Sequence, residues 1–188
     1  PIHVLNVNGS DHTVKLWDTH TGKLLHSLTE HKSIIWSVAF APDGTLWAVT
    51  WPDRRQVVQF DDHARAQVMF TFDSDIDSLV FGQPNTPLEN LLFVSHNAGA
   101  AVPEGSPNPN LSELTMIDTA TLSQITVAQN GTRGGVLLAT ATGQLLISQS
   151  HQVDILDPIV APSVIATNPP SQAVVVLPLG VIAAVELG

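Results

Sequence analysis

The sequence of 188 residues has no cysteine, few basic residues and no long apolar segment. The absence of cysteine excludes a disulfide-stapled fold and a thiolate metal site. Seven Lys and Arg against seventeen Asp and Glu give a formal net charge of −10. This charge argues against nucleic acid or an anionic membrane surface as a partner, because both need clustered cations. No apolar run approaches the roughly 18 residues that a membrane helix needs, so we expect no membrane insertion.

Motifs of the common enzyme classes are missing as well. The sequence contains no G-x-S-x-G elbow, no P-loop, no dinucleotide-binding glycine pattern and no H-E-x-x-H. Ser95-His96 and Ser150-His151-Asp154 are chance neighbours rather than a catalytic triad, which needs a positioned base and a carboxylate. We therefore predict no catalytic residue and no cofactor.

What the sequence does contain is a series of short apolar segments rich in β-branched and aromatic residues. Apolar residues make up 44% of the chain and charged residues 13%, which predicts a globular protein with a sizeable core. Segments such as "TVKLWD" (13–18) and "KLLHSLT" (23–29) are separated by turn residues, and "APDGT" (41–45) is typical of a hairpin. No segment has helical periodicity over ten or more residues. The sequence predicts an all-β fold.

The composition changes near residue 66. All four Trp and six of the seven basic residues precede this point, so the formal charge is 6 − 7 = −1 before it and 1 − 10 = −9 after it. Either one fold varies along its length or segments of different ancestry are joined. The Pro-rich stretch 156–180 suggests a boundary, and we predict one domain over 1–157 and a connector with extended strands over 158–188. The irregular segment 97–112 is typical of a long surface loop, an insertion more than a functional loop.

Residues 8–49, "NGSDHTVKLWDTHTGKLLHSLTEHKSIIWSVAFAPDGTLWAV", resemble the WD-repeat family of β-propellers. In such a propeller each blade is a four-stranded antiparallel sheet beside a central channel. The resemblance implies that Asp11, Trp17 and His31 belong to a buried hydrogen-bonded network within a blade. The second blade should end in another Trp-Asp pair, for which Phe60 and Asp61 stand in.

Beyond residue 66 the spacing of the strands is kept while the Trp-Asp signature is lost. "LTMIDTATLSQITVA" (114–128) resembles the YVTN type of propeller repeat of bacterial surface proteins, and "APSVIATNPPSQAVVVLPLGVIAAV" (161–185) resembles the start of a bacterial immunoglobulin-like repeat. These resemblances imply an extracellular or bacterial cell-surface location for the natural parent of residues 67–188.

At roughly 40 to 45 residues per blade, residues 1–157 supply three to four blades and hence an incomplete ring. An incomplete ring leaves sheet faces and edges open, which drives pairing with another chain. We expect a fragment, either natural or an engineered or chimeric half-propeller, that forms a homo-oligomer or joins a complementary propeller fragment. A protein ligand is a further expected partner.

Only weak candidates for a metal site exist. Asp73, Asp75 and Asp77 alternate along "DSDID", but Ser78 and Pro84 replace the Gly and Glu of an EF-hand loop, so a solvated turn is favoured.

Three classes of function remain open. A noncatalytic scaffold is our main prediction, and a segment of a secreted bacterial adhesin is the first alternative. The second alternative is a metal-dependent lactonase-like propeller hydrolase, whose metal would be held by Asp77, Asn97 and Asp154.

Overall fold

The computed structural model describes ten stretches of the chain, and β-strands are the regular secondary structure found in them. The described residues are 2–6, 14–18, 20–28, 35–50, 55–63, 65–97, 112–131, 135–159, 175–177 and 180–184. The predicted all-β fold is therefore confirmed. Within these stretches no helix has the length and apolar character needed to cross a bilayer.

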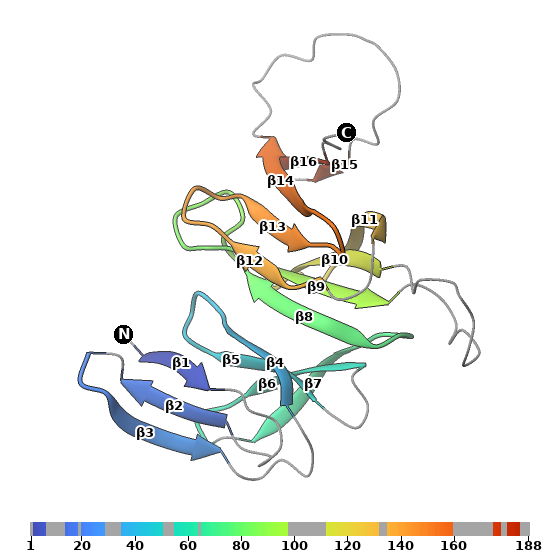
Figure 1. Ribbon diagram of the computed structural model, residues 1–188. Helices are drawn as coiled ribbons and strands as arrows, with labels where there is room; N and C mark the ends of the chain where they lie inside the picture. The colour runs from blue at the N-terminus through green and yellow to red at the C-terminus, as the bar shows by residue number, and fades with distance from the viewer. Residues whose placement is uncertain are drawn as a thin grey trace, which may run out of the picture.

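The strands form four antiparallel sheets that follow one another in chain order; the first two lie at the bottom of Figure 1, and the third and fourth are above them. The first sheet has the order β1-β2-β3, the second β4-β5-β6-β7, the third β11-β10-β9-β8 and the fourth β12-β13-β14-β16-β15. The bounds are β1 (Ile2–Asn6), β2 (Val14–Asp18), β3 (Lys23–Leu28), β4 (Ile35–Phe40), β5 (Leu46–Thr50), β6 (Gln56–Phe60), β7 (Ala66–Thr71), β8 (Ile76–Phe81), β9 (Leu91–Asn97), β10 (Ser112–Asp118), β11 (Gln124–Gly131), β12 (Leu137–Ala139), β13 (Leu145–Ser148), β14 (Val153–Ile159), β15 (Val175–Leu177) and β16 (Gly180–Ala184).

Local sequence explains where the strands turn. In the predicted hairpin between β4 and β5, the Asp43 carboxylate accepts a hydrogen bond from the backbone N–H of Thr45 (2.9 Å), and Gly44 has a φ of 87°. A positive φ is easily adopted by glycine, which has no Cβ. The hairpin closes with a hydrogen bond from the Ala41 N–H to the Thr45 carbonyl (2.9 Å).

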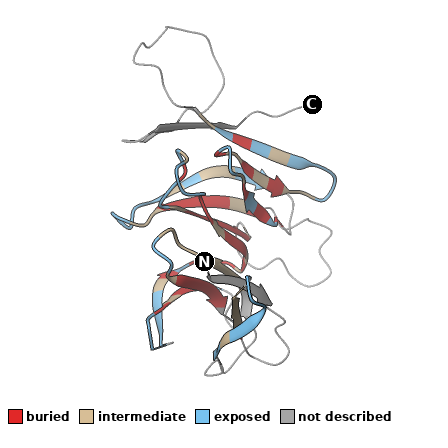
Figure 2. Ribbon diagram, turned by 90° about the vertical axis from the view of Figure 1, so that its left-hand side faces the viewer, coloured by how far each residue is buried: buried red, intermediate tan, exposed pale blue. Residues whose placement is uncertain are grey.

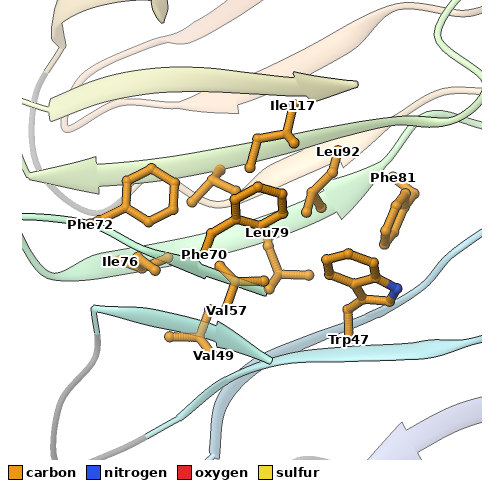
Figure 3. Close-up of a cluster of buried hydrophobic side chains, with 11 residues drawn as sticks. Trp47, Val49, Val57, Phe70, Phe72, Ile76, Leu79, Phe81, Leu92 and Ile117 are labelled. Atoms are coloured by element: carbon orange, nitrogen blue, oxygen red, sulfur yellow. The ribbon is translucent and has the colours of Figure 1, made fainter. Parts of the chain in front are cut away.

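Three hydrophobic layers hold the four sheets together face to face. Val14 of β2 packs with Leu46, Ala48, Val58 and Phe60 between the first and second sheets. The opposite face of the second sheet packs on the third sheet, where buried aromatic and aliphatic side chains of both sheets interlock (Figure 3). A third layer, which includes Phe93, Met116 and Leu145, lies between the third and fourth sheets. Figure 2 shows the buried residues concentrated where sheets face each other.

The sheets are blades of an incomplete β-propeller. The second and third sheets have the four antiparallel strands of a blade, and their first strands, β4 and β8, lie side by side, with β12 of the fourth sheet beside β8. This arrangement puts the first strands of the second, third and fourth sheets innermost, as expected for strands around a propeller axis. The predicted fold class, incomplete blades of antiparallel sheet, is confirmed.

The layers continue across residue 66, and the core between the second and third sheets contains residues from Trp47 to Ile117. The change of composition thus falls inside continuous packing. The predicted boundary at 157 falls within β14, and β16 pairs with β14, placing Pro158 opposite Ile182. The division into 1–157 and 158–188 stays a prediction. Most of the predicted loop, residues 98–111, lies outside the described residues.

Candidate functional site

Each sheet has an apolar residue followed by aspartate at or near the end of the third strand of its blade. In the first sheet this strand is β2, because β1 is counted there as the second strand. The pairs are Trp17-Asp18, Phe60-Asp61, Ile117-Asp118 and Leu156-Asp157. The Trp-Asp signature occurs once in the sequence, whereas in the structure an apolar-Asp pair occupies the equivalent position in every sheet. Phe60-Asp61 takes the place at the end of β6 that the sequence suggested for it.

The aspartates of the first and third sheets stabilise equivalent turns with the same pattern of hydrogen bonds. Asp18 Oδ1 accepts hydrogen bonds from the N–H groups of His20 (2.8 Å) and Thr21 (3.0 Å). Asp118 Oδ1 does the same for Ala120 (2.8 Å) and Thr121 (3.2 Å). The hydrogen bonds from Thr21 and His20 lower the pKa of Asp18, because they favour its charged form. The repeated role of these aspartates is to fix the turn into the fourth strand.

Asp61 closes the corresponding turn of the second sheet with the help of Arg65. Its Oδ1 accepts hydrogen bonds from the backbone N–H of Arg65 and of His63, both at 2.9 Å, and its Oδ2 lies 2.7 Å from both Arg65 Nε and Nη2. The backbone and side-chain hydrogen bonds from Arg65 lower the pKa of Asp61 to about 2. Asp61, Asp62, His63 and Arg65 are exposed, so this stretch is a structural turn at the surface.

A buried histidine lies at one end of the third sheet. His96 Nδ1 lies 3.0 Å from the hydroxyl of Ser74, which precedes β8, and Nε2 lies 2.9 Å from the hydroxyl of Thr115 on β10. The ring also contacts Phe72 at a centroid distance of 4.7 Å. Burial lowers the pKa of His96, opposed by the Asn97 carbonyl and by the charges of Glu113 and Asp77. This cluster links the loop before β8 to the second and third strands of one blade.

The His96 cluster lacks the third member of a catalytic triad. In a serine hydrolase, the second ring nitrogen of the histidine donates to a carboxylate that orients it. Here that nitrogen meets the Thr115 hydroxyl. A cavity of about 670 Å³ borders the cluster and is lined by residues that include Asp73, His96 and Glu113. The geometry supports a structural role for the histidine.

The predicted site residues are only partly described. Asp11 and His31 lie outside the described residues, and Trp17 lies on β2, partly buried. The proposed buried network of Asp11, Trp17 and His31 stays a prediction. Ser74, His96 and Thr115 were not predicted, because their sequence separations of 22 and 19 residues give no local pattern.

The weak metal candidates are spread over a turn and a strand. Asp73 is exposed before β8, the Asp75 carboxylate lies 3.8 Å from Arg55 Nε, and Asp77 is on β8 itself. Among the described residues, no three His, Cys, Asp or Glu are grouped so that they could hold a metal ion. The structure therefore does not bring Asp73, Asp75 and Asp77 together as a ligand set.

The residues of the lactonase-like alternative are on three different strands. Asp77 is on β8, Asn97 ends β9, and Asp154 is on β14 of the next sheet. Asp154 borders a separate cavity of about 300 Å³ between the third and fourth sheets. Asn97 borders the cavity beside His96, so Asn97 and Asp154 do not line a common cavity.

The side of the fourth sheet that points away from the third sheet is apolar, and we call it the outer face. Leu138 of β12 is paired with Leu146 of β13, which is paired with Ile155 of β14, so the three side chains lie in one row. Val136 and Val153 extend it. The exposed fractions are 66% for Val136, 57% for Leu138, 60% for Val153 and 39% for Ile155. The alternate residues, such as Leu137 and Leu145, are buried against the third sheet.

Comparisons with known proteins agree with the blade architecture over a short stretch of the chain. Residues 22–50 match the family model for the WD domain, G-beta repeat. A stretch of 34 residues is 53% identical to the F-box-like/WD repeat-containing protein TBL1X of Mus musculus, covering 18% of this chain and 6% of that protein. WD repeat and SOCS box-containing protein 1 of Homo sapiens is 46% identical over 37 residues, and that of Takifugu rubripes is 31% identical over 72 residues. These matches cover 20% and 38% of this chain, and 9% and 15% of the relatives.

The matched stretches thus cover only 6% to 15% of the length of these relatives. The predicted WD-repeat resemblance is confirmed, and the matched residues comprise β3, β4 and β5, the last strand of the first sheet and the first two of the second. The resemblances to YVTN repeats and to immunoglobulin-like repeats stay predictions.

Proposed function

We propose that the chain is a noncatalytic β-propeller scaffold that associates with a second copy of itself to complete its ring. The observation that carries this proposal is the exposed apolar outer face of the fourth sheet. Exposed apolar patches on a sheet face mark interaction surfaces, because their burial is the main favourable term in association.

A comparison of two blades supports this interpretation. Residues 46–49 of β5 are apolar without interruption, and all four are buried, because the second sheet lies between two others. Residues 136–139 and 145–147 are just as continuously apolar, but only their alternate side chains are covered. Uninterrupted apolar strands are typical of sheets that are buried on both faces. The composition of the fourth sheet therefore fits a blade with a neighbour on each side.

The noncatalytic character of the proposed scaffold is supported by the polar clusters. The Ser74-His96 pair has a hydroxyl where a triad has a carboxylate, and the described residues contain no group arranged for a metal ion. Among the relatives, WD repeats stand in larger proteins named for an F-box-like region or a SOCS box. By analogy, we propose that this chain is also a scaffold that contacts other proteins.

The association is tested by sedimentation equilibrium of the wild-type chain and of two variants. The wild type should be a dimer at concentrations between about 1 and 100 μM, a range typical of specific association. Ile155→Lys should shift the chain toward monomer, because it places a charge in the outer face. Val68→Lys is the matched control, because Val68 is 50% exposed on β7 of the second sheet. A wild type that stays a compact monomer throughout this range would overturn the proposal.

A calorimetric titration tests the noncatalytic character separately. Addition of Ca²⁺ or Zn²⁺ to the wild-type chain should give no stoichiometric heat of binding. Tight binding of one ion per chain would instead favour the lactonase-like alternative, and the variants Asp77→Asn and Asp154→Asn would then show whether these carboxylates hold it.

A further inference from the structure

The apolar residue before the aspartate of each third strand has a constant packing direction. Phe60 of the second sheet packs toward the first sheet, Ile117 of the third sheet toward the second, and Leu156 of the fourth sheet toward the third. Their exposed fractions are 5%, 0% and 5%. In each case this residue is covered by the preceding blade.

Trp17 has the same position in the first sheet, and among the described residues no other sheet packs on that side of it. Val14 and Leu16 of β2 pack toward the second sheet, so Trp17 points to the other face of the strand. Leu24 of β3 is its register partner on that face and is 41% exposed. We call this surface the leading face. In the later sheets the equivalent face packs against the preceding sheet, so the leading face is where another blade would pack.

The two open faces belong to opposite ends of the stack of sheets and have opposite formal charges. Alternation along β2 puts Lys15 on the side of Trp17, for a formal charge of +1, whereas Asp18 and its register partner Lys23 lie on the other side. Alternation along β14 puts Asp157 on the side of Val153 and Ile155, for a formal charge of −1, whereas Asp154 borders the cavity between the third and fourth sheets. Contact between the leading face of one copy and the outer face of another joins opposite charges, whereas contact between two identical faces joins like charges.

We propose that two copies associate head to tail, with the leading face of each copy on the outer face of the other. This inference rests on the proposed self-association and adds its surfaces and symmetry. Trp17 is then covered by the outer face of the partner, just as Phe60, Ile117 and Leu156 are each covered by the preceding sheet of their own chain. Two such contacts related by a twofold axis close a ring of eight sheets, within the usual range of four to eight blades.

The test uses one exposed residue on each face. Leu24→Lys alters the leading face and Ile155→Glu the outer face, and both positions are exposed enough for folding to be kept. Each variant alone should self-associate about tenfold or more weakly than the wild type, because each of its two contacts contains an unpaired charge. An equimolar mixture should form a heterodimer, because one contact is then wholly native and the other pairs Lys with Glu.

Native mass spectrometry of the variants and of their mixture gives the stoichiometry, with Val68→Glu as the control that should dimerise like the wild type. Circular dichroism verifies that each variant is folded, and Trp17→Phe, a milder change, should weaken association in the same direction. If Leu24→Lys dimerises normally while Ile155→Glu does not, the outer faces pair with each other and the head-to-tail contact is overturned, although self-association stands. A monomeric wild type overturns both proposals, and an open polymer overturns the closed ring alone.

Discussion

His96 is a titratable side chain that the fold keeps at 8% exposure. The hydroxyl groups of Ser74 and Thr115 satisfy both ring nitrogens, so the ring is buried without losing its hydrogen bonds. Each partner comes from a different element, one from the loop before β8 and one from β10. The histidine therefore couples the position of that loop to the pairing of β9 and β10.

Protonation of His96 should destabilise the fold. Burial lowers the pKa of His96 in the folded state below the ordinary histidine value of 6.5. The unfolded chain therefore binds the proton more readily than the folded chain. The stabilising contribution is complete above pH 6.5 and is lost as the pH falls through 6.5 toward the lowered pKa. Urea unfolding from about pH 8 to about pH 5 should show a steeper loss of unfolding free energy for the wild type than for His96→Gln. Equal slopes in the two proteins would contradict this assignment.

The Asp118 turn provides a second prediction at the residue scale. Asp118→Ala removes the acceptor for two backbone N–H groups, those of Ala120 and Thr121, which then turn to water. We expect a loss of about 1 kcal/mol in unfolding free energy, typical of net hydrogen-bond contributions at an exposed turn. Asp118→Asn keeps a side-chain oxygen and should lose less. Urea unfolding measures both variants, and an equal loss would show that charge rather than the acceptor matters.

At the scale of elements, the sequence predicted the strands and turns well because their signals are local. "TVKLWD" and "KLLHSLT" became β2 and β3, and the Pro-Asp-Gly turn precedes β5. Contacts between elements could not be predicted in this way. The Ser74-His96 contact depends on the register of β8 and β9, which shifts between Ile76 and Ser78. A shift of one residue changes the face to which a side chain points.

The loop between β8 and β9 depends on close backbone approach at Gly82. Gly82 is buried, and a Cβ at this position would overlap the backbone carbonyl of Leu88. Gly82→Ala should cost about 3 kcal/mol, because the loop must shift and the buried Leu88 side chain moves with it.

Gly22→Ala is the control for that variant. Gly22 has a φ of 67° and open space around it, so its cost should be about 1 kcal/mol from backbone conformation alone. Chemical denaturation of both variants compares the two causes, and a Gly82→Ala loss no larger than that of Gly22→Ala would contradict the close approach.

For the whole molecule, the sequence predicted an incomplete ring from its length, and the four sheets agree with this arithmetic. The open faces could not be located, because an apolar strand such as "VLLAT" has the same sequence whether one or both of its faces are covered. Trp17 illustrates the same limit. It was singled out as a member of a signature, but its packing direction follows from the folded chain, where Val14 and Leu16 pack on the opposite face of β2.

The stability of the molecule should depend on its concentration. If two copies cover each other's open faces, mass action stabilises the folded dimer, and each tenfold rise in concentration adds about 1.4 kcal/mol per dimer. The melting temperature should then rise by a few degrees per tenfold rise in concentration. Differential scanning calorimetry at several concentrations measures this slope. Val68→Lys should keep it, whereas Ile155→Lys should melt at a lower temperature than the wild type at each concentration, because a charge in the outer face weakens the dimer.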